Sequence, residues 1–276
     1  MRVARLRACH PRGAVIDTHC HLDKPAFDAD RGAVLARARA AGVAEVIVPA
    51  VGPDGWEPLR ALAAGTRGVR FALGIHPQLL PELDPAGDLD RLAELDAALS
   101  RGGAVGVGEC GLDGVSARAG AGPFPAPMER QLAVLRGHMA LARRHGLPLL
   151  LHCLGAHEPL LSLLREGPPS PGGLLHSYSG SAEQVRDFAI LGLGFSFAGP
   201  VTYPRARRPL AAARAVPRPL LYLETDAPDQ TPWPHRGRNE PALLAGIATA
   251  LAVALKLPRE ELEALTTANA RALFGP

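Results

Sequence analysis

Eight short apolar runs, each followed by a segment with the apolar spacing of a helix, constrain the fold of this 276-residue chain more than any other feature. The apolar runs predict strands over residues 14–17, 44–49, 69–73, 104–108, 148–151, 173–175, 194–197 and 220–223. The helical segments span residues 30–41, 56–64, 89–100, 128–145, 157–165, 181–191, 205–215, 241–255 and 259–274. Repeated strand-then-helix units of this size predict an α/β fold, a (β/α)8 barrel whose functional residues follow the carboxyl ends of the strands.

The other segments are consistent with a single barrel. With 47% hydrophobic residues the chain can bury a large core, so we expect one domain over residues 14–276 after an N-terminal extension, residues 1–13. The Gly- and Pro-rich residues 114–127 predict a long loop before the next helix. His138 and His145 lie on an Arg-rich predicted helix, and we expect both to be solvated.

Side chains of the types that bind divalent metals follow six of the predicted strands. His19 and His21 follow the first strand, and the alternation of side chains along a strand points both in one direction. The others, in strand order, are His76, Glu109, His152, His176 and Asp226. Isolated surface or core histidines would not be expected to gather at one end of a barrel, so the pattern predicts a metal centre there.

The chemistry of this set favours two ions. Several imidazoles with two carboxylates suit Zn²⁺, Mn²⁺, Co²⁺ or Ni²⁺, whereas a site for Mg²⁺ alone normally has only oxygen ligands. The set is too large for one tetrahedral ion with an open position, so we expect two divalent ions that share a bridging carboxylate. Glu109, in the middle of the strand order, is the expected bridge, because neither Lys24 nor Lys256 is placed to form a carbamylated-lysine bridge.

The composition says little about the binding partners of the protein and more about the cellular compartment in which it works. The net charge of +3 is weak evidence for nucleic acid, because the excess of Arg over the two lysines looks like a biased genomic composition. The four cysteines, Cys9, Cys20, Cys110 and Cys153, form no C-x-x-C pair, and free thiols favour a reducing compartment. No early apolar segment or membrane-length run is present, so we expect a cytoplasmic protein without a membrane partner.

Five motifs follow one another along the chain. They are Asp17-Thr18-His19-Cys20-His21-Leu22-Asp23, Gly74-Ile75-His76-Pro77, Gly108-Glu109-Cys110-Gly111-Leu112-Asp113, Glu224-Thr225-Asp226-Ala227-Pro228 with Arg238-Asn239-Glu240-Pro241, and Thr267-Ala268-Asn269-Ala270-Arg271-Ala272-Leu273-Phe274. Together they resemble the TatD family of metal-dependent hydrolases over nearly the whole chain. The resemblance implies a distorted TIM barrel of the amidohydrolase-like group and a deoxyribonuclease of the kind that shortens single-stranded DNA from an end. We expect such an enzyme to be a monomer.

The resemblance also implies roles for the predicted ligands. One metal would be held by His19, His21, Glu109 and Asp226, and the other by Glu109, His152 and His176. Asp226 would also orient or deprotonate the attacking water, which makes Asp226 and Glu109 the implied catalytic residues. The implied cofactors are two divalent ions chosen from Zn, Mn, Mg, Co and Ni.

Several nearby polar residues allow two interpretations each. Ser179 and Ser181 precede a predicted helix, where they either receive a phosphate or cap the helix. His76 either contacts a scissile phosphate or supports the ligands. Arg238 either contacts substrate or fixes the loop after the last strand, and we favour the second role. Arg205 is a candidate phosphate contact.

Three departures from the family pattern bear on the substrate. Gln78 replaces a histidine, Leu154 replaces an arginine and Gly114 replaces an aromatic residue. Because arginine grips phosphates and aromatic rings stack on bases, these departures weaken the case for efficient DNA degradation. A two-metal phosphodiesterase acting on DNA from a 3′ end is preferred, and hydrolysis of a small-molecule or aminoacyl-tRNA ester or amide is the alternative. A non-catalytic accessory subunit is disfavoured, because the ligand set is complete.

Overall fold

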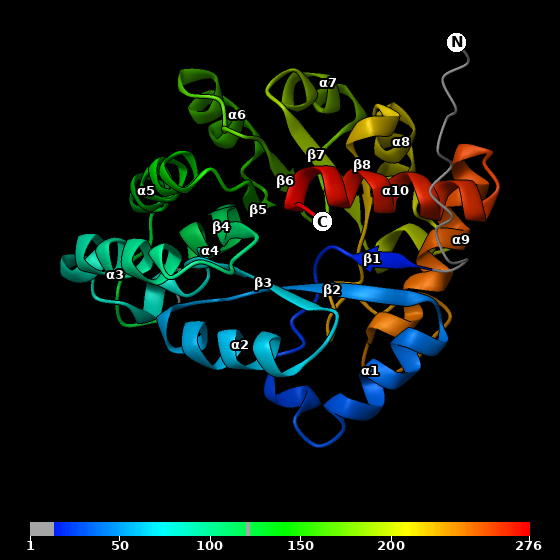
Figure 1. Ribbon diagram of the computed structural model, residues 1–276. Coiled ribbons are helices and arrows are strands. Elements are labelled where there is room, and N and C mark those ends of the chain that lie inside the picture. Colours follow the sequence, from blue (N-terminus) through cyan, green and yellow to red (C-terminus); the bar gives the residue numbers. More distant parts are fainter. Residues whose placement is uncertain (1–13, 120–121) are drawn as a thin grey trace, which may run out of the picture.

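The computed structural model describes residues 14–119 and 122–276, so the predicted N-terminal extension, with Cys9, lies outside the described residues. Within these ranges one parallel sheet of eight strands follows the order of the chain (Figure 1). The strands are β1 (Val15–Asp17), β2 (Val43–Pro49), β3 (Val69–Leu73), β4 (Gly106–Asp113), β5 (Leu149–Leu154), β6 (Gly173–Leu175), β7 (Leu193–Phe197) and β8 (Leu221–Leu223). Thr18 donates from its backbone N and its Oγ1 to Leu223 O at 3.0 Å each, which joins the last strand to the first in a nearly closed barrel.

Helices cover the outside of the sheet, as expected for parallel strands that are buried on both faces (Figure 1). They are α1 (Arg31–Ala40), α2 (Pro53–Gly65), α3 (Asp88–Ser100), α4 (Gly114–Ala119), α5 (Met128–His145), α6 (His157–Glu166), α7 (Ala182–Ile190), α8 (Arg207–Ala215), α9 (Leu244–Leu255) and α10 (Arg259–Phe274). The main core lies between these helices and the strands. The predicted (β/α)8 barrel is confirmed.

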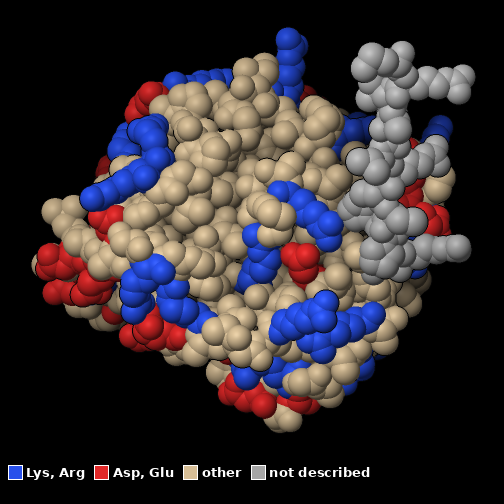
Figure 2. Space-filling model, viewed as in Figure 1, with Lys and Arg blue, Asp and Glu red and all other residues tan. Residues whose placement is uncertain are grey.

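The last helix closes one end of the barrel. A second apolar cluster fills the barrel interior, and its members are Ile16, Ile47, Ala72, Leu150, Leu174, Tyr222, Ala270 and Phe274. The last two belong to α10, which crosses the sheet near β1 and β8 (Figure 1). On the face seen in Figure 2, Lys and Arg side chains lie interspersed with Asp and Glu among neutral residues, so the positive net charge makes no continuous basic surface there. The polar residues at the carboxyl ends of the strands lie at the opposite end.

Strands β4 and β5 run further than the apolar pattern predicts. Their pairing continues through Gly111 with His152 to Asp113 with Leu154, after a register shift between Val107 and Cys110. Gly111 has φ 142°, and an added Cβ would overlap the carbonyl oxygen of His152, so this close approach needs glycine. Glu109 and His152 therefore lie inside extended strands, which holds them more rigidly than loops would.

The prediction of a long loop over residues 114–127 is wrong at its start. Residues Gly114–Ala119 form α4. Asp113 Oδ1 accepts hydrogen bonds from the backbone N of Val115 and of Ser116 at 2.8 Å each, and so caps the free N–H groups of the first turn. Gly114 looks like a helix breaker in the sequence, but it lies at the first position of the helix, where its cost is small.

The prediction of two solvated histidines on α5 is also wrong. His138 is fully buried, and it accepts a hydrogen bond from Ile75 N at its Nε2 (3.0 Å) and donates from Nδ1 to Val134 O (2.9 Å). His145 is partly buried, with its Nε2 2.7 Å from Asp96 Oδ1. Burial lowers the pKa of His138 to about 4.

This buried histidine predicts a loss of stability in acid. The folded-state pKa of His138 lies below its unfolded value of 6.5, so the unfolded chain takes up the proton first as the pH falls. The contribution of His138 to the free energy of unfolding is complete above pH 6.5 and falls by about 3 kcal/mol as the pH drops through the folded pKa. His138→Gln keeps an acceptor for Ile75 N and cannot titrate.

Urea unfolding of metal-stripped protein at about pH 7 and about pH 4.5 tests this prediction. The difference in unfolding free energy between the two pH values is expected to be smaller in His138→Gln than in wild type by about 2 to 3 kcal/mol. An equal pH dependence in the two proteins would show that His138 does not resist protonation.

Two further features bear on the environment of the protein. Cys20, Cys110 and Cys153 are buried free thiols within the described part of the chain. Across residues 14–119 and 122–276, no single helix is both long and apolar enough to cross a membrane. Only Pro241–Leu255 and Arg259–Phe274 taken together reach that length and apolar character, and a bend of 107° separates them.

Candidate metal centre

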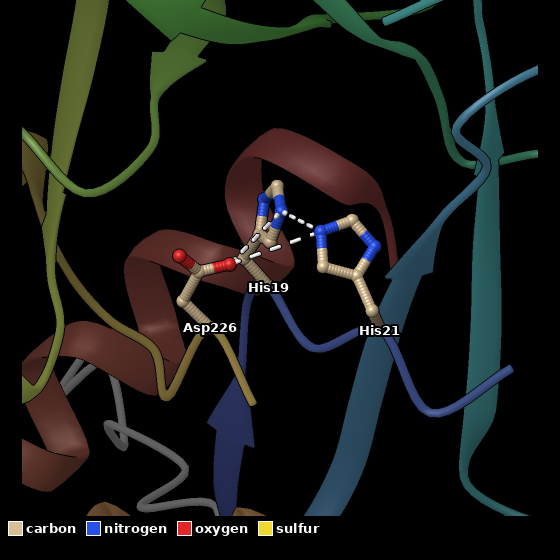
Figure 3. Close-up of side chains that lie close together, drawn as sticks. All are labelled: His19, His21 and Asp226. Carbon is tan, nitrogen blue, oxygen red and sulfur yellow. Dashed lines mark hydrogen bonds and ion pairs between the residues drawn. The ribbon is translucent and has the colours of Figure 1, made fainter. Parts of the chain in front are cut away.

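A buried carboxylate fixes the two chain segments that carry the first ligands. Asp17 Oδ1 accepts hydrogen bonds from Thr225 N (2.9 Å) and His19 N (3.3 Å), and Asp17 Oδ2 accepts from Thr225 Oγ1 (2.5 Å). Asp226 N then donates to His19 O at 2.8 Å. The end of β1 and the loop after β8 are thus held together, and His19, His21 and Asp226 converge (Figure 3). Burial raises the pKa of Asp17 to about 8, against the hydrogen bonds from Thr225 and His19.

The first group of donor atoms has the spacing of metal ligands. His19 Nε2 lies 3.4 Å from His21 Nε2, and both nitrogens lie near Glu109 Oε2, at 3.2 Å and 3.4 Å. Asp226 Oδ1 lies 3.7 Å from His19 Nε2 and 3.8 Å from His21 Nε2. Four ligands about 2.1 Å from a tetrahedral ion would be about 3.4 Å apart, so these four atoms surround a space of the right size.

The second group uses the other oxygen of Glu109. Glu109 Oε1 lies 3.1 Å from His152 Nδ1 and 2.8 Å from His176 Nε2, and these two nitrogens are 3.1 Å apart. His76 Nε2 lies 2.9 Å from the same oxygen, so His76 also faces this group. Glu109 thus directs one oxygen to each group, as a bridging carboxylate would.

Further acidic residues contact the far side of two imidazoles. Asp113 Oδ2 lies 3.3 Å from His152 Nε2 and accepts from Gln78 Nε2 at 2.7 Å. Glu224 Oε1 lies 3.6 Å from His176 Nδ1 and accepts from Ser177 N at 2.5 Å. Carboxylates placed in this way orient metal-binding histidines and increase their basicity.

Sequence reasoning did not assign a role to Asp113, Glu224 or Gln230. Gln230 Nε2 donates to Asp226 Oδ2, and Gln230 Oε1 accepts from Ser177 Oγ at 2.8 Å. Asp113 and Glu224 lie inside the family motifs at residues 108–113 and 224–228, and this position could have signalled their role. Gln230 lies in a Pro-rich loop without such a signal. Ser177, Asp226 and Gln230 have φ values of 42°, 55° and 49°, in the left-handed region where strained residues of functional sites are often found.

The buried atoms of the site fit a divalent cation. Glu109 is 1% exposed, and within the described residues its Oε2 has no hydrogen-bond partner. Burying a carboxylate oxygen without a hydrogen-bond partner costs free energy of folding unless a cation neutralises its charge. Burial favours the neutral acid, yet the imidazoles of His76, His176 and His19 outweigh this effect and hold the pKa of Glu109 well below its usual value. Burial raises the pKa of Asp226 to about 6, and His176 and His21 oppose this rise.

Outside this cluster, the polar candidates lie in different places. Ser181 caps α7, in a reciprocal pair of hydrogen bonds with Gln184, as the capping interpretation expects. Ser179 is exposed at the mouth of the barrel, where it lines a cavity beside His176. Arg238 binds Asp30 with two nitrogens, at 2.8 Å each, and lies over the ring of Phe27, so it fixes the loop after β8.

Two cavities flank the donor groups. One, of about 380 Å³, is largely apolar and extends from His176 and Asp226 towards Phe197 and Val201. The other, of about 400 Å³, extends from the same pair of ligands to Gln78. Arg205, the predicted phosphate contact, is exposed and lines neither cavity.

The neighbouring Arg208 lines the apolar cavity instead. Leu154 lines both cavities and is 39% exposed. At this position the wall of both cavities is therefore apolar, as expected from the replacement of the family's arginine by Leu154.

Comparison with known proteins decides the family. The family model described as TatD related DNase matches residues 16–275. The chain belongs to the TatD family. It is 36% identical to the uncharacterized metal-dependent hydrolase YjjV of Escherichia coli K12, over 94% of this chain and 97% of that protein. It is 34% identical to the 3′-5′ ssDNA/RNA exonuclease TatD of Klebsiella pneumoniae strain 342, over 95% of this chain and 98% of that protein.

The TatD-family assignment agrees with solved structures. The crystal structure of E. coli YjjV matches with a TM-score of 0.87 and 34% identity, and covers 96% of this chain and 100% of that one. A 5-methylcytosine deaminase from Klebsiella pneumoniae, at 16% identity and a TM-score of 0.60, shares the fold and covers 92% of this chain and 74% of that chain. The family and the donor groups together support the activity of a metal-dependent hydrolase.

Proposed function

We propose that this TatD-family protein is a two-metal phosphodiesterase that shortens single-stranded DNA from its 3′ end. The observation that carries the proposal is the orientation of the Glu109 carboxylate, whose two oxygens face two different groups of donors. His19, His21, Glu109 and Asp226 would hold one divalent ion, and Glu109, His152 and His176 the other. Two such ions would polarise a phosphoryl group and lower the pKa of a bound water.

The chain supplies the proton transfer and the positioning. Asp226 directs Oδ1 towards His19 and His21, while Oδ2 is held by Gln230, so its carboxylate keeps one orientation. We assign to Asp226 the removal of the proton from the attacking water. His76, directed at Glu109 Oε1 from the other side, is placed to donate a hydrogen bond to a phosphate oxygen or to the bridge.

The relatives support a nucleic-acid substrate. The TatD proteins of Klebsiella pneumoniae and Erwinia amylovora, 34% and 32% identical to this chain, are named 3′-5′ ssDNA/RNA exonucleases. We also propose that the enzyme works in the cytoplasm, where the buried thiols of Cys20, Cys110 and Cys153 stay reduced.

Hydrolysis of labelled single-stranded oligonucleotides tests the proposal. Metal-stripped protein is resupplied with Mg²⁺, Mn²⁺, Zn²⁺, Co²⁺ or Ni²⁺, and each oligonucleotide is offered with a free and with a blocked 3′ end. We expect stepwise shortening of the free 3′ end alone, and its loss in His152→Ala, which excludes a contaminating nuclease. Absence of cleavage with every metal, although about two ions are bound per chain, would contradict the proposal.

Hydrolysis of an uncharged ester or amide is the second candidate, and Leu154 is the observation that favours it. This side chain lines both cavities beside His152, where a phosphate would gain from a cation. The apolar cavity behind it would suit an uncharged group equally well.

Leu154→Arg separates the two candidates. If the substrate is a phosphodiester, we expect the variant to raise kcat/KM for single-stranded DNA about tenfold, because a charged hydrogen bond at a partly exposed position contributes part of about 1.5–3 kcal/mol. Leu154→Gln, which has a polar but uncharged side chain, is the matched control and should change kcat/KM little. The second candidate would be favoured if both variants lose activity on DNA and if wild type hydrolyses neutral esters faster than it hydrolyses DNA.

A further inference from the structure

Two aromatic side chains are exposed at one edge of the barrel mouth. Trp233 is 57% exposed and Tyr203 is 44% exposed, and they are the exposed large aromatic side chains of residues 14–119 and 122–276. The other large exposed apolar residues, such as Leu89 and Val253, are aliphatic. An exposed aromatic pair on an enzyme with only two tryptophans and three tyrosines calls for an explanation.

The backbone holds this pair in place. Tyr203 Oη donates to Thr231 O at 3.2 Å, and Trp233 N donates to Thr202 Oγ1 at 2.7 Å. The loop after β7 and the loop after β8 are therefore cross-linked in both directions. They also touch at Gly199, where an added Cβ would overlap the carbonyl oxygen of Gln230. The two rings thus sit on a rigid support, not on free loops.

The same two loops lead to the metal centre. Val201 and Gln230, from the two loops, line the cavity of about 380 Å³ whose other end is formed by His176 and Asp226. Trp233 is three residues from Gln230, so their Cα atoms are at most about 10 Å apart. A chain that lies across the two rings can therefore place its end at the donor groups.

The segments of these two loops that carry the aromatic pair are positively charged. Residues 198–209 and 230–237 contain four arginines, Arg205, Arg207, Arg208 and Arg236, and no Asp or Glu. Within the described residues none of the four forms an ion pair. Exposed aromatic rings beside unpaired cations are the combination with which proteins bind single-stranded nucleic acid, because the rings stack on bases and the cations attract phosphates.

We propose that Tyr203 and Trp233 form an aromatic ledge on which the bases of a single-stranded nucleic acid stack while its end enters the metal centre. This proposal rests on the proposed phosphodiesterase function and extends it, because the ledge would bind nucleotides other than the one being released. It also places a stacking surface elsewhere than at Gly114, where the sequence lacks the family's aromatic residue.

The two tryptophans make the proposal directly measurable. Trp56 is buried, 5% exposed, and donates from Nε1 to Gly74 O, so its fluorescence should not respond to a ligand. Metal-loaded protein is titrated with a hydrolysis-resistant phosphorothioate oligodeoxythymidylate. We expect quenching of the tryptophan fluorescence in wild type and none in Trp233→Phe, which keeps a ring and should bind with nearly unchanged affinity.

Loss of both rings should weaken binding. Tyr203→Ala with Trp233→Ala is expected to raise the Kd about 10- to 100-fold, since stacking of one base contributes about five- to a hundredfold. KM for a long oligonucleotide should rise by a similar factor, while kcat on a dinucleotide, too short to reach the ledge, stays unchanged. Val253→Ala, at an exposed apolar residue of α9, is the matched control.

The outcomes separate the ledge from the proposed function. If wild type cleaves the dinucleotide but the double variant binds and cleaves the long oligonucleotide as wild type does, the ledge is wrong and the phosphodiesterase stands. Absence of quenching in wild type overturns the ledge as well. If wild type cleaves neither substrate with any metal, the proposed function itself fails.

Discussion

Glu109→Gln is expected to abolish two-metal binding and to lower kcat by about 10³-fold or more, because one carboxylate serves both donor groups. Its Oε2 lies within 3.4 Å of the nitrogens of His19 and His21, and its Oε1 lies within 3.1 Å of those of His152 and His176. An amide keeps the shape but carries no charge and offers only one good ligand atom. Changes in residues that merely orient ligands already cost about 10- to 100-fold, so loss of a shared ligand must cost more.

Metal content and turnover measured on the same samples test this expectation. Wild type should bind about two ions per chain and Glu109→Gln one or none, by elemental analysis after dialysis. Glu45→Gln is the control, since Glu45 pairs with Arg70 and with Arg271 of α10, the helix that closes the opposite end of the barrel. A Glu109→Gln protein that retains two ions, with the fold intact by circular dichroism, would refute the bridging role.

The positions of the donor residues could be predicted from the sequence because parallel strands have a simple rule. Strands buried on both faces appear as continuous apolar runs, and the residues after their carboxyl ends meet at one edge. His19, His21, His176 and Asp226 obey this rule directly, because each follows its strand within a few residues.

The contents of the site beyond the ligands could not be predicted in the same way. Gln230 donates to Asp226 from within the loop after β8, and both residues have a left-handed backbone conformation. No apolar pattern in the sequence predicts such a loop conformation. Arg208, and not Arg205, lines the cavity, and Arg208 lies in the first turn of α8 whereas Arg205 precedes that helix. His138 is buried because α5 packs against β4. The many arginines of this helix instead suggest that it is exposed to solvent. Such contacts depend on tertiary packing, whereas the order of strands and ligands depends on the chain alone.

Asp226→Asn is expected to lower kcat about 10²- to 10⁴-fold while most of the metal stays bound, since general-base catalysis contributes about this factor. Asp226 has φ 55°, and asparagine tolerates this left-handed conformation nearly as well as aspartate, so the backbone should not change. The amide oxygen of asparagine can still face His19 and His21, but the side chain can no longer accept a proton from water.

Asp229→Asn is the matched control for this substitution. Asp229 lies three residues further along the same loop, its side chain is 67% exposed, and it pairs with Lys24 at 3.0 Å. We expect kcat in that variant to be within about twofold of wild type, because an exposed ion pair contributes little. The comparison of metal content then decides what Asp226 does. If Asp226→Asn loses activity and metal together, Asp226 is chiefly a ligand. If it loses activity and keeps two ions, Asp226 is the base, and the division of labour between Glu109 as bridge and Asp226 as proton acceptor holds.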